Sequence, residues 1–140
     1  MQLEHLIFIG GILHFGILFA SALTPNVLDW RRELTKLDPL SRQLVWVHGA
    51  FIVLVIVAFG ALSVAYAPEL AGGAALARAV CAFIALFWAA RLGVQFFVFD
   101  ARPKLTTPLL RIGYRALTFV FAYLAVVFAM AAATSCRTPP

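Results

Sequence analysis

Residues 44–67 read LVWVHGAFIVLVIVAFGALSVAYA, a run without a single aspartate, glutamate, lysine or arginine. An α-helix rises about 1.5 Å per residue, so this run is long enough to cross the roughly 30 Å hydrocarbon core of a bilayer. Backbone amides in lipid must be hydrogen-bonded within their own segment, and a helix achieves this. The run therefore predicts a transmembrane helix.

Three further runs are mainly apolar and also long enough to cross a bilayer, at about 3–24, 74–99 and 109–134. The whole chain of 140 residues is 64% hydrophobic and 12% charged, whereas soluble domains average about half apolar and a quarter charged. We therefore predict a single transmembrane domain over residues 1–140. Its fold class is all-α, an integral membrane four-helix bundle with up-down topology.

The basic residues predict the orientation of this bundle. Eight lie in or beside the first and third connections: Arg31, Arg32, Lys36, Arg42, Arg102, Lys104, Arg111 and Arg115. The opposite side has Arg78 and Arg137. By the positive-inside rule, both termini should lie on the non-cytoplasmic side, and we expect a bacterial cytoplasmic membrane. Membrane orientation explains the net charge of +5, so we expect no nucleic-acid partner.

The first connection has an amphipathic pattern over residues 28–37. Trp30, Leu34 and Leu37 recur at helical spacing, with arginine and lysine on the other side. This pattern predicts a short helix lying in the cytoplasmic headgroup layer and ended by the Asp38–Pro39 pair. Interfacial anchoring is its expected role.

Polar side chains inside the apolar runs are the candidate functional residues, because burying them in lipid is costly. We assign ligand binding to His14, His48, Arg91, Gln95, Tyr114 and Arg115. Each lies in the cytoplasmic half of its run; a rise of 1.5 Å per residue places His14 about 15 Å deep and Arg91 about 13 Å deep. They also follow helical faces, such as Cys81, Trp88, Arg91 and Gln95 in the third run.

If these faces point inward, they form a polar intramembrane pocket that opens toward the cytoplasm. Our leading hypothesis is a non-enzymatic protein that binds a lipid-like, quinone-like or anionic small molecule with an apolar tail. Arg91 and Arg115 would supply positive charge, and the other four would supply hydrogen bonds. An accessory subunit in a homo- or hetero-oligomer is an equivalent role for such a chain. The expected surroundings are the lipid bilayer.

Two other functions remain open at this stage. In the first, His14 and His48 ligate haem b as a cofactor in electron transfer, although their depths differ by about 8 Å. In the second, the chain is a small transporter or membrane enzyme. The sequence lacks catalytic motifs, carboxylates are almost absent from the spans, with only Glu4 and Asp100 near their ends, and we assign no catalytic or metal-binding residue. The polar residues also have structural readings: His14 and His48 as hydrogen-bonding links between helices, and Arg115 as a snorkelling orientation signal.

Small residues at spacings of four predict where the helices pack closely. Gly16 and Ala20 form such a pair in the first run, and Ala85, Ala89 and Gly93 form a series in the third. Small side chains allow helix backbones to approach each other in a membrane. We therefore expect helix contacts at these positions.

Overall fold

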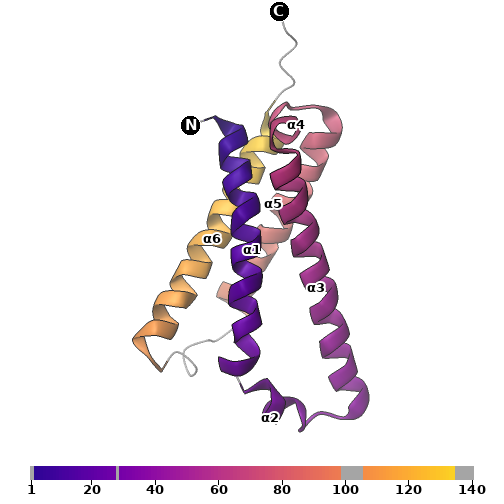
Figure 1. Ribbon diagram of the computed structural model, residues 1–140, viewed down its shortest axis with the longest axis vertical. Helices are drawn as coiled ribbons and strands as arrows, with labels where there is room; N and C mark the ends of the chain where they lie inside the picture. The colour runs from indigo at the N-terminus through magenta and orange to yellow at the C-terminus, as the bar shows by residue number, and fades with distance from the viewer. Residues whose placement is uncertain (1, 28, 99–105, 135–140) are drawn as a thin grey trace, which may run out of the picture.

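The computed structural model describes residues 2–27, 29–98 and 106–134 and is helical with short turns over these ranges. Four helices are long and apolar enough to cross a membrane: α1 (Leu3–Val27), α3 (Pro39–Ala65), α5 (Ala75–Phe97) and α6 (Pro108–Ala133). Two short helices connect them, α2 (Trp30–Leu34) and α4 (Ala67–Ala71) (Figure 1). The predicted all-helical membrane bundle is confirmed.

The start of α3 differs from the prediction of residue 44, because the helix begins at Pro39. The Asp38 carboxylate caps it by accepting a hydrogen bond from the Ser41 amide at 3.0 Å. Proline suits the first turn, where its missing N–H would have no helical partner. The pair that should end one helix therefore starts the next.

Two other boundaries also differ from the expected ones. Helix α1 continues through Pro25 to Val27. The fixed φ of proline is compatible with a helix, and because Pro25 lies near the helix end, its missing N–H removes only one hydrogen bond. The amphipathic segment is helical only over Trp30–Leu34. The Trp30 ring meets the Trp46 ring edge-on, with 6.4 Å between centroids, and so connects α2 to α3.

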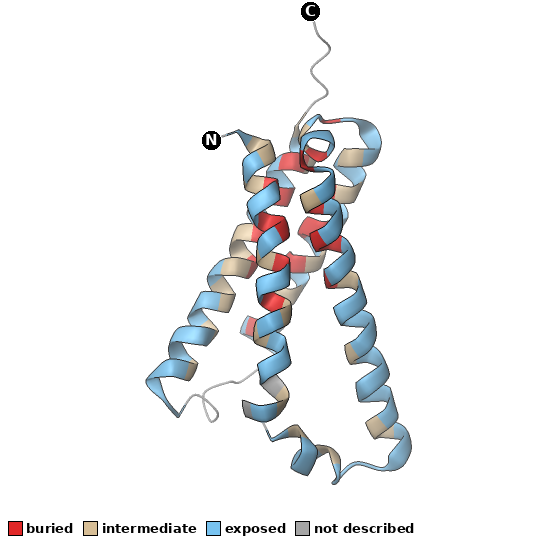
Figure 2. Cartoon of the chain, in the orientation of Figure 1, coloured by how far each residue is buried: buried red, intermediate tan, exposed pale blue. Residues whose placement is uncertain are grey.

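The bundle has two unequal halves. In the terminus-side half, which contains the N-terminus, α4 and the end of α6, α1 packs against α3 and α6, and α5 packs against α6. Figure 2 shows that buried residues concentrate there; the largest buried side chains include Ile7, His14, Ile84, Trp88, Leu124 and Phe128. In the loop-side half, which contains α2 and the start of α6, α1, α3 and α6 diverge from one another (Figure 1).

Glycines set the close approach of α1 to α3. A Cβ on Gly11 would lie 2.7 Å from Val64 Cγ2 and 3.0 Å from the Val64 backbone nitrogen. A Cβ on Gly60 would lie 3.1 Å from His14 Cβ. By contrast, Gly16 and Gly93 have no atom within 4 Å of an added Cβ. The expected close contacts at those two glycines are therefore wrong, because both face open space rather than a neighbouring helix.

A candidate polar site inside the bundle

His14 is fully buried, and both of its ring nitrogens are hydrogen-bonded. Nδ1 lies 2.7 Å from the Gly10 carbonyl oxygen, which can only accept, so Nδ1 carries the proton. The Trp88 indole N–H then donates to Nε2 at 3.0 Å. The imidazole is therefore neutral and joins α1 to α5.

Aromatic rings surround this imidazole. Its centroid lies 6.1 Å from the Phe59 ring of α3, 5.3 Å from the Trp88 ring of α5 and 6.0 Å from the Phe128 ring of α6. All three contacts are edge-to-face, the arrangement that aromatic quadrupoles favour. His14 thus contacts every other long helix at one level of the bundle, as expected for a hydrogen-bonding link between helices.

Trp88 also connects His14 to Arg91. The Trp88 ring stacks on Phe121 of α6 with 5.0 Å between centroids and 24° between planes. One turn further along α5, the half-buried Arg91 guanidinium lies 5.4 Å from the centroid of the same Phe121 ring. This is within the range of a cation–π interaction. The cation therefore faces α6 and the bundle interior.

A polar clamp joins α5 to α6 next to Arg91; we use this name for Gln95, Tyr114 and Thr118. The Gln95 side-chain amide donates to the Thr118 hydroxyl, which donates to the Tyr114 carbonyl at 2.9 Å. The Tyr114 hydroxyl donates to the Gln95 backbone carbonyl at 3.4 Å. That carbonyl is in the last turn of α5, where intrahelical donors run out. The Tyr114 hydroxyl therefore supplies a hydrogen-bond donor to a backbone carbonyl at the end of α5.

His48 and Arg115 lie outside this group. His48 is exposed on α3, and its Nδ1 lies 2.9 Å from the Leu44 carbonyl of its own helix. Eleven residues separate it from Phe59, the α3 residue that contacts His14, which is about 16 Å along the helix. The structure thus does not bring the two imidazoles to one iron, and Trp88 occupies the His14 nitrogen that would ligate it. Arg115 is exposed on α6.

Several residues that organise the site were not among the sequence candidates. Trp88 was on the polar stripe of its run, and Phe121 continues the Tyr114–Thr118 stripe by one turn, so periodicity could have found both. Tyr123 donates from its hydroxyl to the Leu6 carbonyl at 3.0 Å, joining α6 to α1. Nothing in the sequence pairs these two residues, because 117 positions separate them.

The described side chains offer little to a metal ion. Across residues 2–27, 29–98 and 106–134, no group of three or more histidine, cysteine, aspartate or glutamate side chains could hold one. Arg91 and the clamp therefore offer hydrogen bonds and positive charge as their chemistry.

Comparison with known proteins finds no matching family model, no curated relative and no similar solved structure.

Proposed function

We propose that this membrane protein binds a small amphiphile whose anionic or carbonyl-bearing head contacts Arg91. The observation that carries the proposal is the position of this guanidinium, half-buried at membrane depth and directed against the Phe121 ring. An arginine fork binds a carboxylate or phosphate through paired hydrogen bonds, and these bonds are strong where water is scarce. Intramembrane ionisable residues commonly mark such sites.

The neighbouring polar residues then act by positioning Arg91 rather than by contacting the head. The clamp of Gln95, Tyr114 and Thr118 fixes α5 against α6 one turn from Arg91. The bond from Trp88 to His14 holds the indole that stacks on Phe121. Four of the six sequence candidates, namely His14, Arg91, Gln95 and Tyr114, thus belong to one connected group, and His48 and Arg115 do not.

The divergence of the helices supports a ligand with an apolar tail. Below the buried core, large apolar side chains such as Phe19 of α1 and Ile112 of α6 are exposed. In a bilayer these surfaces are covered by hydrocarbon chains, and a tail attached to the bound head would lie among them. The expected ligands are therefore long-chain carboxylates, quinones or related lipids.

Binding of two defined probes tests the proposal. A long-chain fatty acid and a benzoquinone with a tail of similar length would be titrated against purified wild-type protein and Arg91→Leu. We expect about a tenfold loss of affinity for at least one probe, the effect of removing a charged hydrogen-bonding group. Arg31→Leu, an exposed arginine on α2, is the matched control and should bind like wild type.

The result that would contradict the proposal is equal affinity of wild type and Arg91→Leu for both probes. Arg91→Lys sharpens the test, because lysine keeps the charge but lacks the planar fork. Intermediate affinity for the fatty acid in this variant supports paired recognition of a carboxylate.

A second candidate function, an accessory subunit, is favoured by the surface of α3. Residues 43–54 are exposed in this chain except for the half-buried Gly49, and they include Trp46, His48 and Phe51. A helix of a partner subunit could cover this surface. Cysteine crosslinking from Phe51→Cys in native membranes, with Cys81 and Cys136 replaced by alanine, tests it; the absence of any crosslinked species would count against the role.

A further inference from the structure

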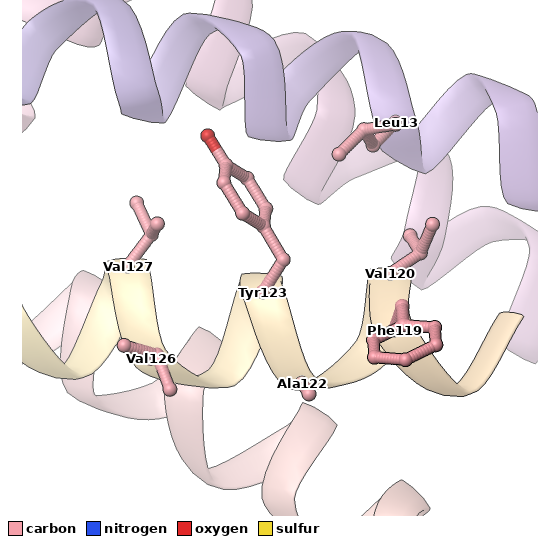
Figure 3. Close-up of a pocket in the computed structure, with 7 residues that line it drawn as sticks. All are labelled: Leu13, Phe119, Val120, Ala122, Tyr123, Val126 and Val127. Carbon is pink, nitrogen blue, oxygen red and sulfur yellow. The ribbon is translucent and has the colours of Figure 1, made fainter. Parts of the chain in front are cut away.

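An apolar groove runs along the membrane-facing surface between α1 and α6. Its volume is about 580 Å³, and its lining consists of Leu13, Phe119, Val120, Ala122, Tyr123, Val126 and Val127. Figure 3 shows Tyr123 reaching from α6 toward α1, where its hydroxyl donates a hydrogen bond to the Leu6 carbonyl. The remaining lining is hydrocarbon, so the groove suits an acyl chain rather than a polar molecule.

Positive charge lies at the loop-side mouth of this groove. Arg115, Phe119, Ala122 and Val126 follow spacings of four, three and four, which place them on one face of α6. Arg115 is exposed, one turn before the groove begins. Side chains on a helix lean toward its N-terminus, which for α6 is the loop-side end. The guanidinium therefore points toward the membrane surface and away from the groove.

The dimensions fit a phospholipid of one leaflet. The groove begins four residues beyond Arg115 and ends twelve residues beyond it, about 6 Å and 18 Å along the helix. One leaflet contributes about 15 Å of a 30 Å hydrocarbon core. An acyl chain whose headgroup lies at Arg115 would thus enter the groove at its Phe119 end and follow it toward the middle of the bilayer.

We infer that the face between α1 and α6 binds one anionic phospholipid. Its phosphate contacts Arg115, and one of its acyl chains enters the groove at Phe119 and lies beside Ala122. Charge complementarity favours an anionic headgroup over a zwitterionic one, because the phosphate of a zwitterionic lipid is already paired with a cationic group of the same headgroup. This site is separate from the Arg91 site, since neither Arg91 nor a clamp residue lines the groove.

Native mass spectrometry of the purified full-length protein tests the inference. Phosphatidylglycerol and phosphatidylcholine with identical chains would be titrated separately. We expect the wild type to retain phosphatidylglycerol about tenfold more strongly, and Arg115→Gln to remove this preference. Arg31→Gln, which makes the same charge change on α2, should keep it. Equal retention of the two lipids by the wild type, or equal losses in the two variants, would overturn the inference.

A second pair of variants tests the acyl-chain contact. Ala122→Trp would fill the groove, and we expect it to lose about tenfold in retention of both lipids. Ala90→Trp adds the same ring to an exposed position on α5 and should retain them like wild type. A folded Ala122→Trp protein that retains both lipids like wild type would overturn the assignment. If Ala122→Trp does not fold, the result for Arg115→Gln decides, because the Arg115 side chain is exposed and its replacement should leave the fold intact.

Discussion

The two halves of this bundle use the same kind of sequence to different ends. In the terminus-side half, helices meet through glycine and through an aromatic cluster centred on His14. In the loop-side half, α1, α3 and α6 diverge, and interhelical hydrogen bonds join α5 to α6 at the clamp. Apolar length therefore makes a helix long enough to cross the membrane, but it does not make the helix pack against its neighbours.

The physical reason is that lipid tails are as apolar as the helix surfaces they would replace. Helices associate in a membrane through close van der Waals contact and through hydrogen bonds between them. Gly11 and Gly60 allow such contact in one half, whereas Gly49 and Gly113 in the other half have open space around them. The exposed apolar side chains of the loop-side half suit the apolar tail of the proposed ligand.

The largest expected effect comes from adding a side chain where α1 meets α3. Gly11→Ile would place its Cβ 2.7 Å from Val64 Cγ2 and within 3.0 Å of backbone, so a helix must shift. We expect a loss of about 3 kcal/mol in the free energy of unfolding. Gly16→Ile, on the same helix but without neighbours within 4 Å, should be neutral or slightly stabilising. Thermal unfolding in detergent measures both; equal destabilisation would contradict the two-half comparison.

A smaller effect is expected from exchanging the histidines. His14→Phe leaves the buried Trp88 N–H without an acceptor, at a cost of about 1.5 kcal/mol. His48→Phe, on the exposed part of α3, should cost less than about 0.5 kcal/mol. A double-mutant cycle of His14→Phe with Trp88→Phe should show coupling, since either change alone breaks the bond. Additive effects in that cycle would show that the pair does not stabilise the fold.

The polar clamp should contribute less still. Tyr114→Phe removes one hydrogen bond of 3.4 Å to the last turn of α5, and interhelical bonds in membranes average about 0.6 kcal/mol. We expect a loss of this size in unfolding free energy, and a larger change in hydrogen exchange at the end of α5 than at its start. Uniform exchange along α5 in the variant would contradict a local role for the clamp.

The smallest effect is a pH dependence at the start of α3. Hydrogen bonds from Ser41, through its hydroxyl and its amide, hold the pKa of the Asp38 carboxyl below the ordinary value of 3.8. A lowered folded-state pKa means that the cap stabilises α3 above pH 3.8 and is lost as the pH falls through the folded value. The Ser41 amide should then lose protection against hydrogen exchange, relative to its intrinsic exchange rate at the same pH. Asp38→Asn, which caps without titrating, should remove this pH dependence; its persistence would assign it to another group.

The four spans were predictable because about 20 apolar residues in a row have few other structural solutions. The inward direction of Trp88, Arg91 and Gln95 was also predictable, from helical periodicity on α5. The partnership of Trp88 with His14 was not, because 74 residues separate them and their common depth depends on how α1 and α5 cross. His48 followed the same periodic rule, but α3 packs against α1 through its other half, and His48 is exposed.

Distances between pairs of spin labels, measured by double electron–electron resonance, show whether the two halves differ in helix separation. With Cys81 and Cys136 replaced by alanine, spin labels would be placed at Val45 and Ile112 for the loop-side half. A second labelled protein would carry them at Leu62 and Ala129 for the terminus-side half; all four positions are exposed on α3 or α6. In lipid nanodiscs, we predict a longer mean distance for the loop-side pair than for the terminus-side pair (Figure 1). Equal distances, or a shorter loop-side distance, would contradict the greater separation of α3 and α6 in the loop-side half.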